Sequence, residues 1–374
     1  MKNLSSIFLM LFLVNFGYGQ NDKTYNPILT GAPFLRISPD ARAGGLADMG
    51  VATSSDAYSQ YWNASKYAFA KNTSAIGVSF TPYLSQITND VYLLNVSGYT
   101  FIDQDQRSTL GASLNYFSLG DVELTSLGVD NTYVSNGTAK PSEFSFDVSY
   151  GLRLTDYYAM AVALRYIRSD LYNGINDTSN KAASTFAVDL SGMYTTGDIL
   201  VLGMDSEVRA GYNISNIGPK LDYSNDDQKA TYLPSNLRLG SAIDLNFNQN
   251  NKLTLALELS KLLVPTPVAG QTPQDNGVLS SVFSSLSDGE DGKEITYAFS
   301  SEYLLNDAFA FRAGYFYENE DKGARQYLAT GLGLKYDAFG FDASYLFSTN
   351  SNVNNALQNT LRLGLTWYIG EEVR

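Results

Sequence analysis

Large apolar side chains alternate with small or polar ones along most of the chain, starting at Ser74. In residues 158–166 the even positions hold Tyr, Met, Val, Leu and Tyr, whereas the odd positions hold only Ala and one Arg. Residues 144–154 and 358–369 repeat this alternation. A period of two residues places each kind of side chain on its own face of an extended strand, whereas a helix needs a period near 3.6. The pattern therefore predicts an all-β protein.

The same criterion divides the chain after residue 73 into an even number of strands, as a closed antiparallel barrel requires. All ten prolines lie outside these strands, which agrees with the ladder hydrogen bond that a proline inside a strand would lose. The fourteen predicted strands are 74–81, 91–101, 108–117, 144–154, 158–168, 185–194, 206–214, 235–247, 252–263, 294–305, 309–317, 327–336, 339–347 and 358–369.

The connections between these strands alternate in length. Those after odd-numbered strands are long, with 118–143 and 264–293 the longest. Those after even-numbered strands are mostly short; 195–205 is the exception, and its apolar run 199–202 suggests that a flanking strand is drawn wrongly. Short periplasmic turns and long outer loops are typical of Gram-negative outer-membrane barrels. We therefore predict one 14-stranded antiparallel transmembrane outer-membrane β-barrel over residues 74–374, with both chain termini periplasmic.

Charged residues within the strands fall mostly on the face opposite the large apolar side chains. A charge that faces lipid at the bilayer midplane costs about 2–4 kcal/mol, so these side chains are predicted to point inward. We expect an interior network of paired charges, with a polar ligand in the lumen as the alternative. Aromatic residues near strand ends, including Tyr116, Phe117 and Trp367, are expected in the aromatic girdles. The inward charges are Asp147, Arg153, Arg165, Asp189, Arg209, Arg238, Asp244, Glu258, Glu302, Arg312, Asp342 and Arg362.

Residues 31–73, ahead of the first strand, form the other distinct region. They are rich in Ala and Gly, with a short helical stretch predicted near 56–61, and are too polar to cross lipid. They nevertheless carry large apolar side chains that need burial. Packing inside the barrel as an N-terminal lumenal plug satisfies both conditions, and a disordered periplasmic tail is the alternative. The plug candidates are Phe34, Leu35, Arg42, Tyr61, Trp62 and Asn63.

The first 19 residues have the features of a secretory signal peptide. Lys2 supplies the positive charge, residues 4–16 the short apolar stretch, and Gly17-Tyr18-Gly19 a small-x-small cleavage site. The apolar stretch is shorter than the roughly 20 residues that a membrane-spanning helix needs. We expect cleavage after Gly19, which leaves residues 20–73 as the N-terminal segment with its plug.

The composition narrows the possible functions. The chain of 374 residues contains no His and no Cys. This removes Ser–His and Cys–His dyads and the usual ligands of zinc, haem and iron–sulfur clusters. The net charge is −13, and Lys and Arg are not clustered as phosphate binding requires. We therefore expect no catalytic residue, no cofactor, no metal site and no nucleic-acid partner.

One long loop, 264–293, contains a helical pattern. Five of its apolar residues recur at i, i+1, i+4, i+5 and i+8, which predicts an amphipathic helix on the extracellular side. The helix is either a lid over the barrel mouth or a docking surface for another protein. The candidate partner-binding residues are Val278, Leu279, Val282, Phe283 and Leu286.

Several motifs are more specific than a generic barrel. The run Pro-Phe-Leu-Arg-Ile-Ser-Pro-Asp-Ala-Arg-Ala-Gly-Gly at 33–45, followed by Tyr-Trp-Asn at 61–63, resembles the start of the PorV family of type IX secretion. That family resembles the FadL long-chain fatty-acid transporters, in which an N-terminal segment plugs a fourteen-stranded barrel. Where the wider superfamily usually has Asn-Pro-Ala, this chain has Asn63-Ala64-Ser65. The resemblance continues at 260–267, 312–318, 322–323, 342–346 and 359–362.

The resemblance implies a non-enzymatic shuttle. Such a protein receives secreted cargo, through the cargo's C-terminal domain, at a large SprA- or Sov-like translocon barrel. It then delivers the cargo to a PorU-like sortase complex for attachment at the cell surface. The alternative is a FadL-like transporter of hydrophobic compounds. A transporter needs an apolar pocket and a route past the plug, whereas a shuttle needs an exposed docking surface.

Overall fold

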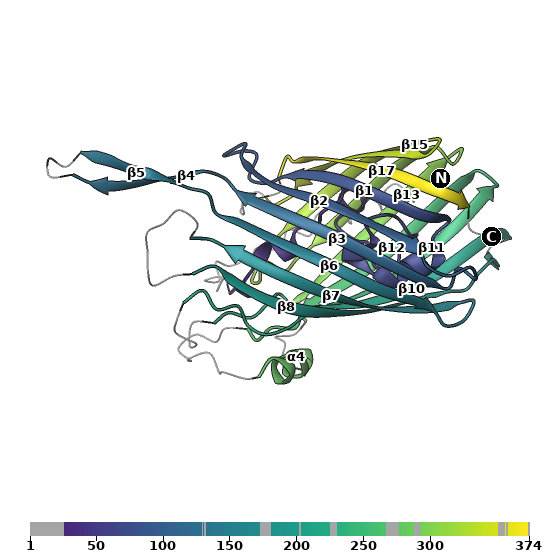
Figure 1. The fold of residues 1–374 in the computed structure, drawn as a ribbon. Helices are drawn as coiled ribbons and strands as arrows, with labels where there is room; N and C mark the ends of the chain where they lie inside the picture. The colour runs from purple at the N-terminus through teal and green to yellow at the C-terminus, as the bar shows by residue number, and fades with distance from the viewer. Residues whose placement is uncertain are drawn as a thin grey trace, which may run out of the picture.

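The computed structural model describes residues 26–128, 130, 132–172, 181–201, 203–224, 230–266, 277–287, 292–350, 356 and 358–372. Fourteen strands form a closed antiparallel barrel around the N-terminal segment (Figure 1). The barrel strands are β1 (Asn72–Pro82), β2 (Val91–Phe101), β3 (Ser108–Leu119), β6 (Ser142–Arg153), β7 (Tyr158–Asp170), β8 (Ala183–Thr195), β10 (Met204–Ile217), β11 (Asn236–Asn248), β12 (Asn251–Leu262), β13 (Ile295–Leu305), β14 (Phe309–Tyr317), β15 (Gln326–Tyr336), β16 (Phe339–Ser348) and β17 (Leu361–Glu372).

Each barrel strand pairs with the next barrel strand along the chain, and the pairing of the last strand with the first closes the ring. β10 pairs with β11 through Gly211↔Gly240, and β17 pairs with β1 through Leu365↔Val78. The predicted fourteen-stranded barrel is therefore confirmed, and each predicted strand overlaps one observed strand. The boundaries of β2 and β14 agree to the residue.

Three short strands lie outside this ring or extend one of its turns. β4 (Val122–Leu127) and β5 (Tyr133–Ala139) form a hairpin that projects away from the barrel, where the sequence predicted only a loop (Figure 1). β9 (Ile199–Val201) pairs with the first residues of β10. The anomalous turn 195–205 is thus a second small hairpin, and β10 begins earlier than predicted.

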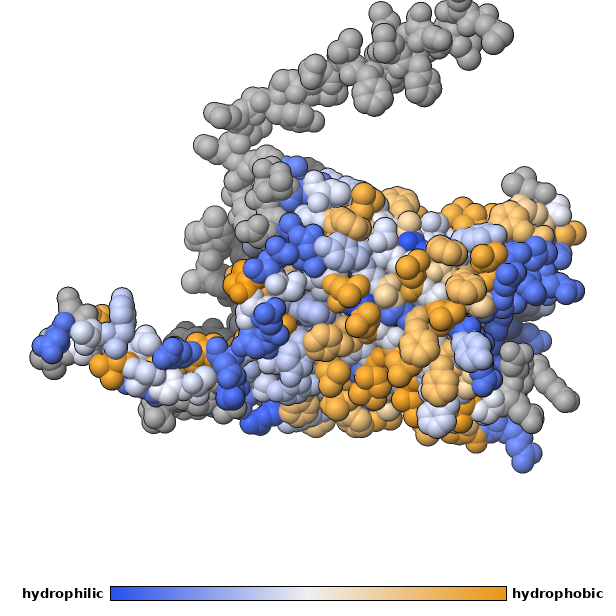
Figure 2. Space-filling view, turned by 90° about the horizontal axis from the view of Figure 1, so that it is seen from above, coloured by the Kyte–Doolittle hydropathy of each residue, from blue (hydrophilic) through white to orange (hydrophobic). Residues whose placement is uncertain are grey.

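The two faces of the wall differ as the alternation predicts. Along β7, Ala161 and Arg165 are buried inside, whereas Val162 and Leu164 are exposed on the outer face. Figure 2 shows hydrophobic side chains over the middle of the visible wall and hydrophilic ones toward its ends. One assignment was wrong: Phe117 points inward and is buried rather than joining an aromatic girdle. Its neighbour Tyr116 faces outward, as the strand period requires.

The N-terminal segment, residues 26–71, lies within the barrel before β1 begins (Figure 1). Its elements are the 3₁₀ helices η1 (Pro33–Arg36) and η2 (Ala64–Phe69) and the α-helices α2 (Ala41–Gly45) and α3 (Ser59–Trp62). We call residues 33–70 the lumenal segment. No helix among the described residues has the length and apolar character needed to cross a bilayer.

The two ends of the barrel are distinguished by their connections. The long-loop end carries the connection from β14 to β15, where Asp321 O accepts a hydrogen bond from Asn26 N. The short-turn end holds the start of β1, where Asn72 pairs with Glu372 of β17. The described chain therefore enters at the long-loop end and passes through the lumen to reach β1. The predicted cleavage site and the mature N-terminus lie outside the described residues.

Candidate functional site

The lumenal segment is built from very short helices that are held by side-chain caps. Asp40 adopts an extended backbone conformation and accepts a hydrogen bond from Ala43 N at 2.7 Å, which caps α2. Its second carboxylate oxygen accepts the Trp62 Nε1–H at 2.8 Å. Asn63 caps η2 by accepting Ser65 N at 3.1 Å. The cap thus forms with Ala64 at the first helical position, where the superfamily usually has proline.

Arg42 links the lumenal segment to the barrel wall. It donates from Nη1 to Asp56 Oδ2 at 2.6 Å within the segment, and from Nε and Nη2 to the two carboxylate oxygens of Glu302 on β13 at 3.2 and 3.0 Å. Arg312 on β14 donates to the same Glu302 at 2.6 Å and to Asp342 on β16 at 2.6 Å. Two guanidinium groups and three carboxylates therefore form one ionic cluster across three wall strands.

Glycine allows α2 to lie directly against the wall. A Cβ atom on Gly45 would come within 2.8 Å of Gly331 Cα on β15, and one on Gly331 would come within 2.9 Å of Gly45 Cα. Real Cβ atoms do not approach backbone so closely, so neither position accommodates a side chain without displacing α2. The Ala-Arg-Ala-Gly-Gly sequence of α2 is thus fitted to close contact with β15.

The remaining plug candidates are buried and contact one another or the wall. Phe34 stacks on Phe117 with ring centroids 6.3 Å apart. Tyr61 OH donates to Leu35 O at 3.0 Å, and the Tyr61 and Trp62 rings meet edge to face at 4.7 Å. Asn63 Nδ2 donates to Gly192 O on β8 at 3.0 Å. The structure thus brings all the predicted plug residues into the lumen; that they prevent passage of solutes stays a prediction.

The interior charge network that the sequence predicts is present among the described residues. Arg165 lies between Asp147 at 2.5 Å and Asp189 at 2.9 Å. Arg209 pairs with Asp244 at 2.6 Å, and Arg362 donates to Asp48 of the lumenal segment. These pairs neutralise charges that lie at membrane depth without exposing them to lipid.

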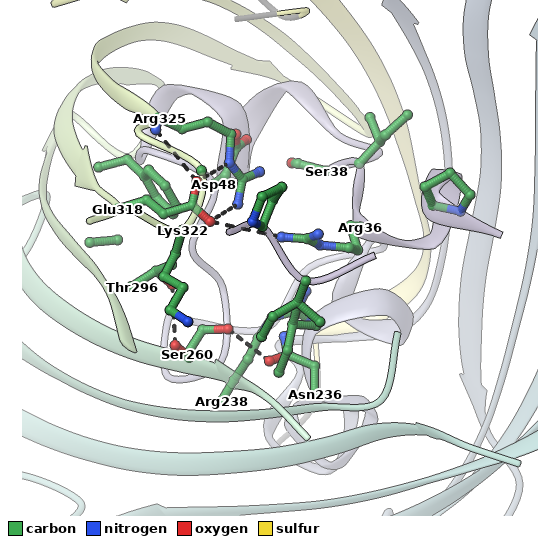
Figure 3. A pocket seen from close by; sticks show the side chains of 18 of the residues that line it. Arg36, Ser38, Asp48, Asn236, Arg238, Ser260, Thr296, Glu318, Lys322 and Arg325 are labelled. Carbon is green, nitrogen blue, oxygen red and sulfur yellow. Dashed lines mark hydrogen bonds and ion pairs between the residues drawn. The ribbon is translucent and has the colours of Figure 1, made fainter. Parts of the chain in front are cut away.

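A cavity of about 460 Å³ remains between the lumenal segment and the wall (Figure 3). Its lining comes from η1 and the residues before it, from β11–β13, and from the β14–β15 connection. In Figure 3 the side chains of Arg36 and Arg325 both point toward Glu318. Eight charged side chains contribute to the lining, namely Arg36, Asp48, Arg238, Glu258, Glu294, Glu318, Lys322 and Arg325. The cavity therefore combines charged groups of both signs with apolar and aromatic side chains.

Sequence reasoning placed Arg238 and Glu258 inside the barrel but did not find this cavity. The spacing of Arg36 and Arg325 in the sequence carries no ligand signature, and both approach Glu318 only because η1 lies against the β14–β15 connection. The only indication of such a cavity in the sequence is the number of charged side chains predicted to face the lumen, for which a polar ligand in the lumen is the alternative interpretation.

The predicted loop helix exists as α4 (Val278–Ser287). Its exposed residues are Leu279, Phe283 and Leu286, with exposed fractions of 63%, 70% and 50%. Val282 is buried, and Val278 is half-buried. The five candidate residues therefore do not form one buried face.

The side of α4 that packs on the protein is made of small polar residues. Ser281 and Ser285 are fully or almost fully buried, and Ser281 Oγ donates to Tyr232 OH at 3.0 Å. A lid would turn its largest apolar side chains toward the barrel. In α4 these side chains instead face away from the protein, which favours the docking interpretation over the lid.

A closed fourteen-stranded antiparallel barrel with an apolar outer wall defines the class of outer-membrane β-barrel proteins. The family model described as "Type IX secretion system protein PorV" matches residues 20–269, and the chain belongs to the PorV family. No curated protein sequence matches the chain significantly.

Solved structures of similar fold include outer-membrane barrels that are described as transporters or channels. The toluene transporter TodX of P. putida has a TM-score of 0.55 and 11% sequence identity, over 89% of this chain and 99% of TodX. The CymD monoaromatic hydrocarbon channel has a TM-score of 0.52 and 11% identity, over 89% and 98% of the two chains. A FadL homologue of Pseudomonas aeruginosa aligns at a TM-score of 0.48 and 12% identity, over 92% and 99%. At such identities TodX and CymD show a shared fold, and nothing about ligands.

Proposed function

We propose that this protein is a non-enzymatic shuttle of the type IX secretion system in the outer membrane of a Gram-negative bacterium. It receives cargo C-terminal domains at the SprA- or Sov-like translocon barrel and delivers them to the PorU-like sortase complex. Membership of the PorV family supports this context. In this proposal the signal peptide 1–19 is removed, the long-loop end is extracellular and the C-terminus is periplasmic. Asn26 lies at the long-loop end, six residues after Gln20, so the expected periplasmic N-terminus is not part of the proposal.

The observation that carries the proposal is the way the lumen is occupied. Arg42 of the lumenal segment pairs with Glu302 on β13, Asp48 of the segment accepts a hydrogen bond from Arg362 on β17, and α2 contacts β15 through Gly45 and Gly331. The cavity that remains carries eight charged side chains beside its apolar residues, a lining that suits a purely hydrophobic compound less well than an apolar pocket would. Cargo recognition is then left to the loops and the outer wall.

Helix α4 is the docking surface that we propose for cargo. Leu279, Phe283 and Leu286 lie at i, i+4 and i+7 and present one apolar stripe to the outside. Apolar and aromatic anchors of this kind usually dominate the binding energy of an interface. The projecting β4–β5 hairpin, with Leu127 and Tyr133 exposed near its tip, is the second candidate surface.

A FadL-like transporter of hydrophobic compounds is the second candidate function. Its support is the fold shared with barrels described as a toluene transporter and a hydrocarbon channel. The charged cavity and the ionic cluster at Arg42 weigh against it.

Affinity purification from native outer membranes separates the two functions. A shuttle should bring down the translocon barrel or secreted cargo, identified by mass spectrometry, and a variant with residues 278–287 replaced by a Gly/Ser linker should bring down less cargo. In liposomes the purified barrel should give no uptake of toluene or a labelled fatty acid above that of protein-free liposomes. Bound fatty acid together with rapid uptake, and no secretion component, would reverse the assignment.

A further inference from the structure

The four acids that line the cavity each have close partners other than Arg36 and Arg238. Glu318 accepts two hydrogen bonds from Arg325, at 2.7 and 3.0 Å. Asp48 accepts from Arg362 and from Tyr327 OH, the latter at 2.6 Å.

The other two acids are also compensated. Glu258 Oε2 accepts the backbone amides of Gly50 and Val51, both at 2.9 Å. Glu294 forms ion pairs with Lys261 and Lys322, both at 3.5 Å. Every carboxylate of the cavity is therefore neutralised or hydrogen-bonded without Arg36 or Arg238.

Arg36 and Arg238 lack comparable acidic partners among the described residues. The nearest carboxylate oxygen to Arg36 is on Glu318 at 3.9 Å, and for Arg238 it is on Glu258 at 4.0 Å. Arg238 donates one long hydrogen bond to Tyr61 OH at 3.3 Å. Its guanidinium carbon lies 5.1 Å from the centroids of both the Tyr61 and Trp62 rings. Two guanidinium groups thus line one cavity, and within the described part of the chain most of their donors have no close acceptor.

Arg238 is buried and Arg36 half-buried, and within the described ranges each has only one ion pair, near 4 Å. A cation that is poorly paired away from water is costly, and a bound anion reduces the cost. A guanidinium group presents donors in a fork that matches the oxygens of a carboxylate or phosphate. We propose that the cavity between Arg36 and Arg238 is a binding site for one oxyanionic group, either a carboxylate or a phosphate. Its volume of about 460 Å³ also admits the anionic end of a larger molecule, so a free ion and a lipid headgroup are both possible sources.

The electrostatics of Arg36 are consistent with this site. Burial, followed by the nearby positive charge of Arg325, lowers the pKa of Arg36 to about 10. Arg36 is therefore still protonated at neutral pH and is held in an environment that a negative charge would relieve.

Trp62 allows binding to be measured directly. The chain has two tryptophans, and Trp367 faces outward from β17. In a Trp367→Phe background, Trp62 is the single tryptophan, and it lies beside Arg238. We would titrate this full-length protein with sodium phosphate and with sodium acetate at constant ionic strength set by chloride. We expect saturable changes in Trp62 emission.

Substitutions test whether the response comes from this site. Arg36→Gln should weaken the apparent affinity at least tenfold, and Arg36→Lys, which keeps the charge and loses the fork, should lie between Gln and the parent. Arg168→Gln is the matched control, since Arg168 is exposed and does not line the cavity. Heat-modifiable migration on gels shows that each variant is folded. No saturable response in folded parent protein that carries no bound lipid, or the same curve in Arg36→Gln, would overturn the proposal.

Native mass spectrometry distinguishes the two sources. A lipid mass that is retained by the parent and lost in Arg36→Gln supports the site and identifies a headgroup as its occupant. Phosphate or acetate binding without such a lipid supports the site with a free ion. A lipid that both proteins retain equally, with no ion response in either, contradicts it.

Discussion

Arg42 of the lumenal segment and Glu302 of β13 form a bidentate ion pair inside the barrel, with nitrogen–oxygen distances of 3.2 and 3.0 Å. The side chains of both residues are about nine-tenths buried. Removing one partner of a buried ion pair costs more free energy than the intact pair contributes to stability, because the remaining charge stays away from water.

Replacing Arg42 with Gln should therefore loosen the lumenal segment. Glu302 would keep Arg312, but Asp56 would lose its guanidinium partner, so we expect a loss of about 3 kcal/mol. Limited proteolysis of the intact barrel should show faster cleavage between Ala41 and Ala64. Arg42→Lys should show a smaller change. Proteolysis as slow as in the parent would mean that this cluster does not hold the segment in place.

The contact between Gly45 and Gly331 gives a second prediction. Gly45→Val places side-chain carbons where Gly331 backbone lies, so α2 must move away from β15. We expect faster proteolysis of the lumenal segment while the strands still form and migration on gels stays heat-modifiable. Gly277→Ala is the control, since a Cβ there meets nothing within 4 Å. Equal proteolysis of the two variants would contradict the packing argument.

Asp40 should make the stability of the lumenal segment depend on pH. Burial, followed by the charge of Asp56, raises the pKa of Asp40 from 3.8 to about 6. Because the folded protein binds this proton more tightly than the unfolded chain, ionised Asp40 destabilises the fold above pH 6. The contribution becomes more favourable as the pH falls from about 6 toward 4.

The comparison with Asp40→Asn isolates this contribution. The parent should gain stability relative to the variant by about 1–3 kcal/mol between pH 7.5 and pH 4.5, measured by denaturant unfolding. A difference between parent and variant that stays constant over this range would show that Asp40 does not titrate in the folded state.

The strand pattern predicted the barrel because lipid and lumen impose opposite requirements on neighbouring residues. In 158–166 the large apolar residues face outward and Ala or Arg faces inward, and that alternation is visible in one segment alone. Phe117 shows the limit of the argument. Phe117 is aromatic and lies near a strand end, which suggests a girdle position. Because its neighbour Tyr116 faces outward, the two-residue period turns Phe117 inward, where it stacks on Phe34.

The cavity of Arg36 and Arg238 could not be predicted from the sequence, because it depends on contacts between residues far apart in the chain. Arg36 and Arg238 are about 200 positions apart and share a cavity only through the path of the lumenal segment. The β4–β5 hairpin was missed because its strands are exposed on both faces and so lack a strong apolar alternation. For α4 the apolar pattern predicted the helix but not which of its faces packs on the protein. That face carries Ser281 and Ser285, both of which are buried.

The outward face of α4 gives the last prediction. Phe283→Ala removes the most exposed aromatic side chain of the stripe, and Leu286→Asp puts a charge at its end. If cargo docks here, each change should cost about 2 kcal/mol of binding, near thirtyfold in affinity, with slower secretion. Neither residue lies in a strand, so both variants should insert and show heat-modifiable migration like the parent.

Ser280→Ala is the matched control, because Ser280 is exposed on the same helix and contributes no apolar surface. Cargo binding should be measured with a purified cargo C-terminal domain on the detergent-solubilised barrel, and secretion in cells that carry each variant. Normal binding and secretion by both Phe283→Ala and Leu286→Asp would eliminate α4 as the docking surface. The β4–β5 hairpin and the lipid-facing wall would then be the surfaces to test, beginning with Leu127 and Tyr133.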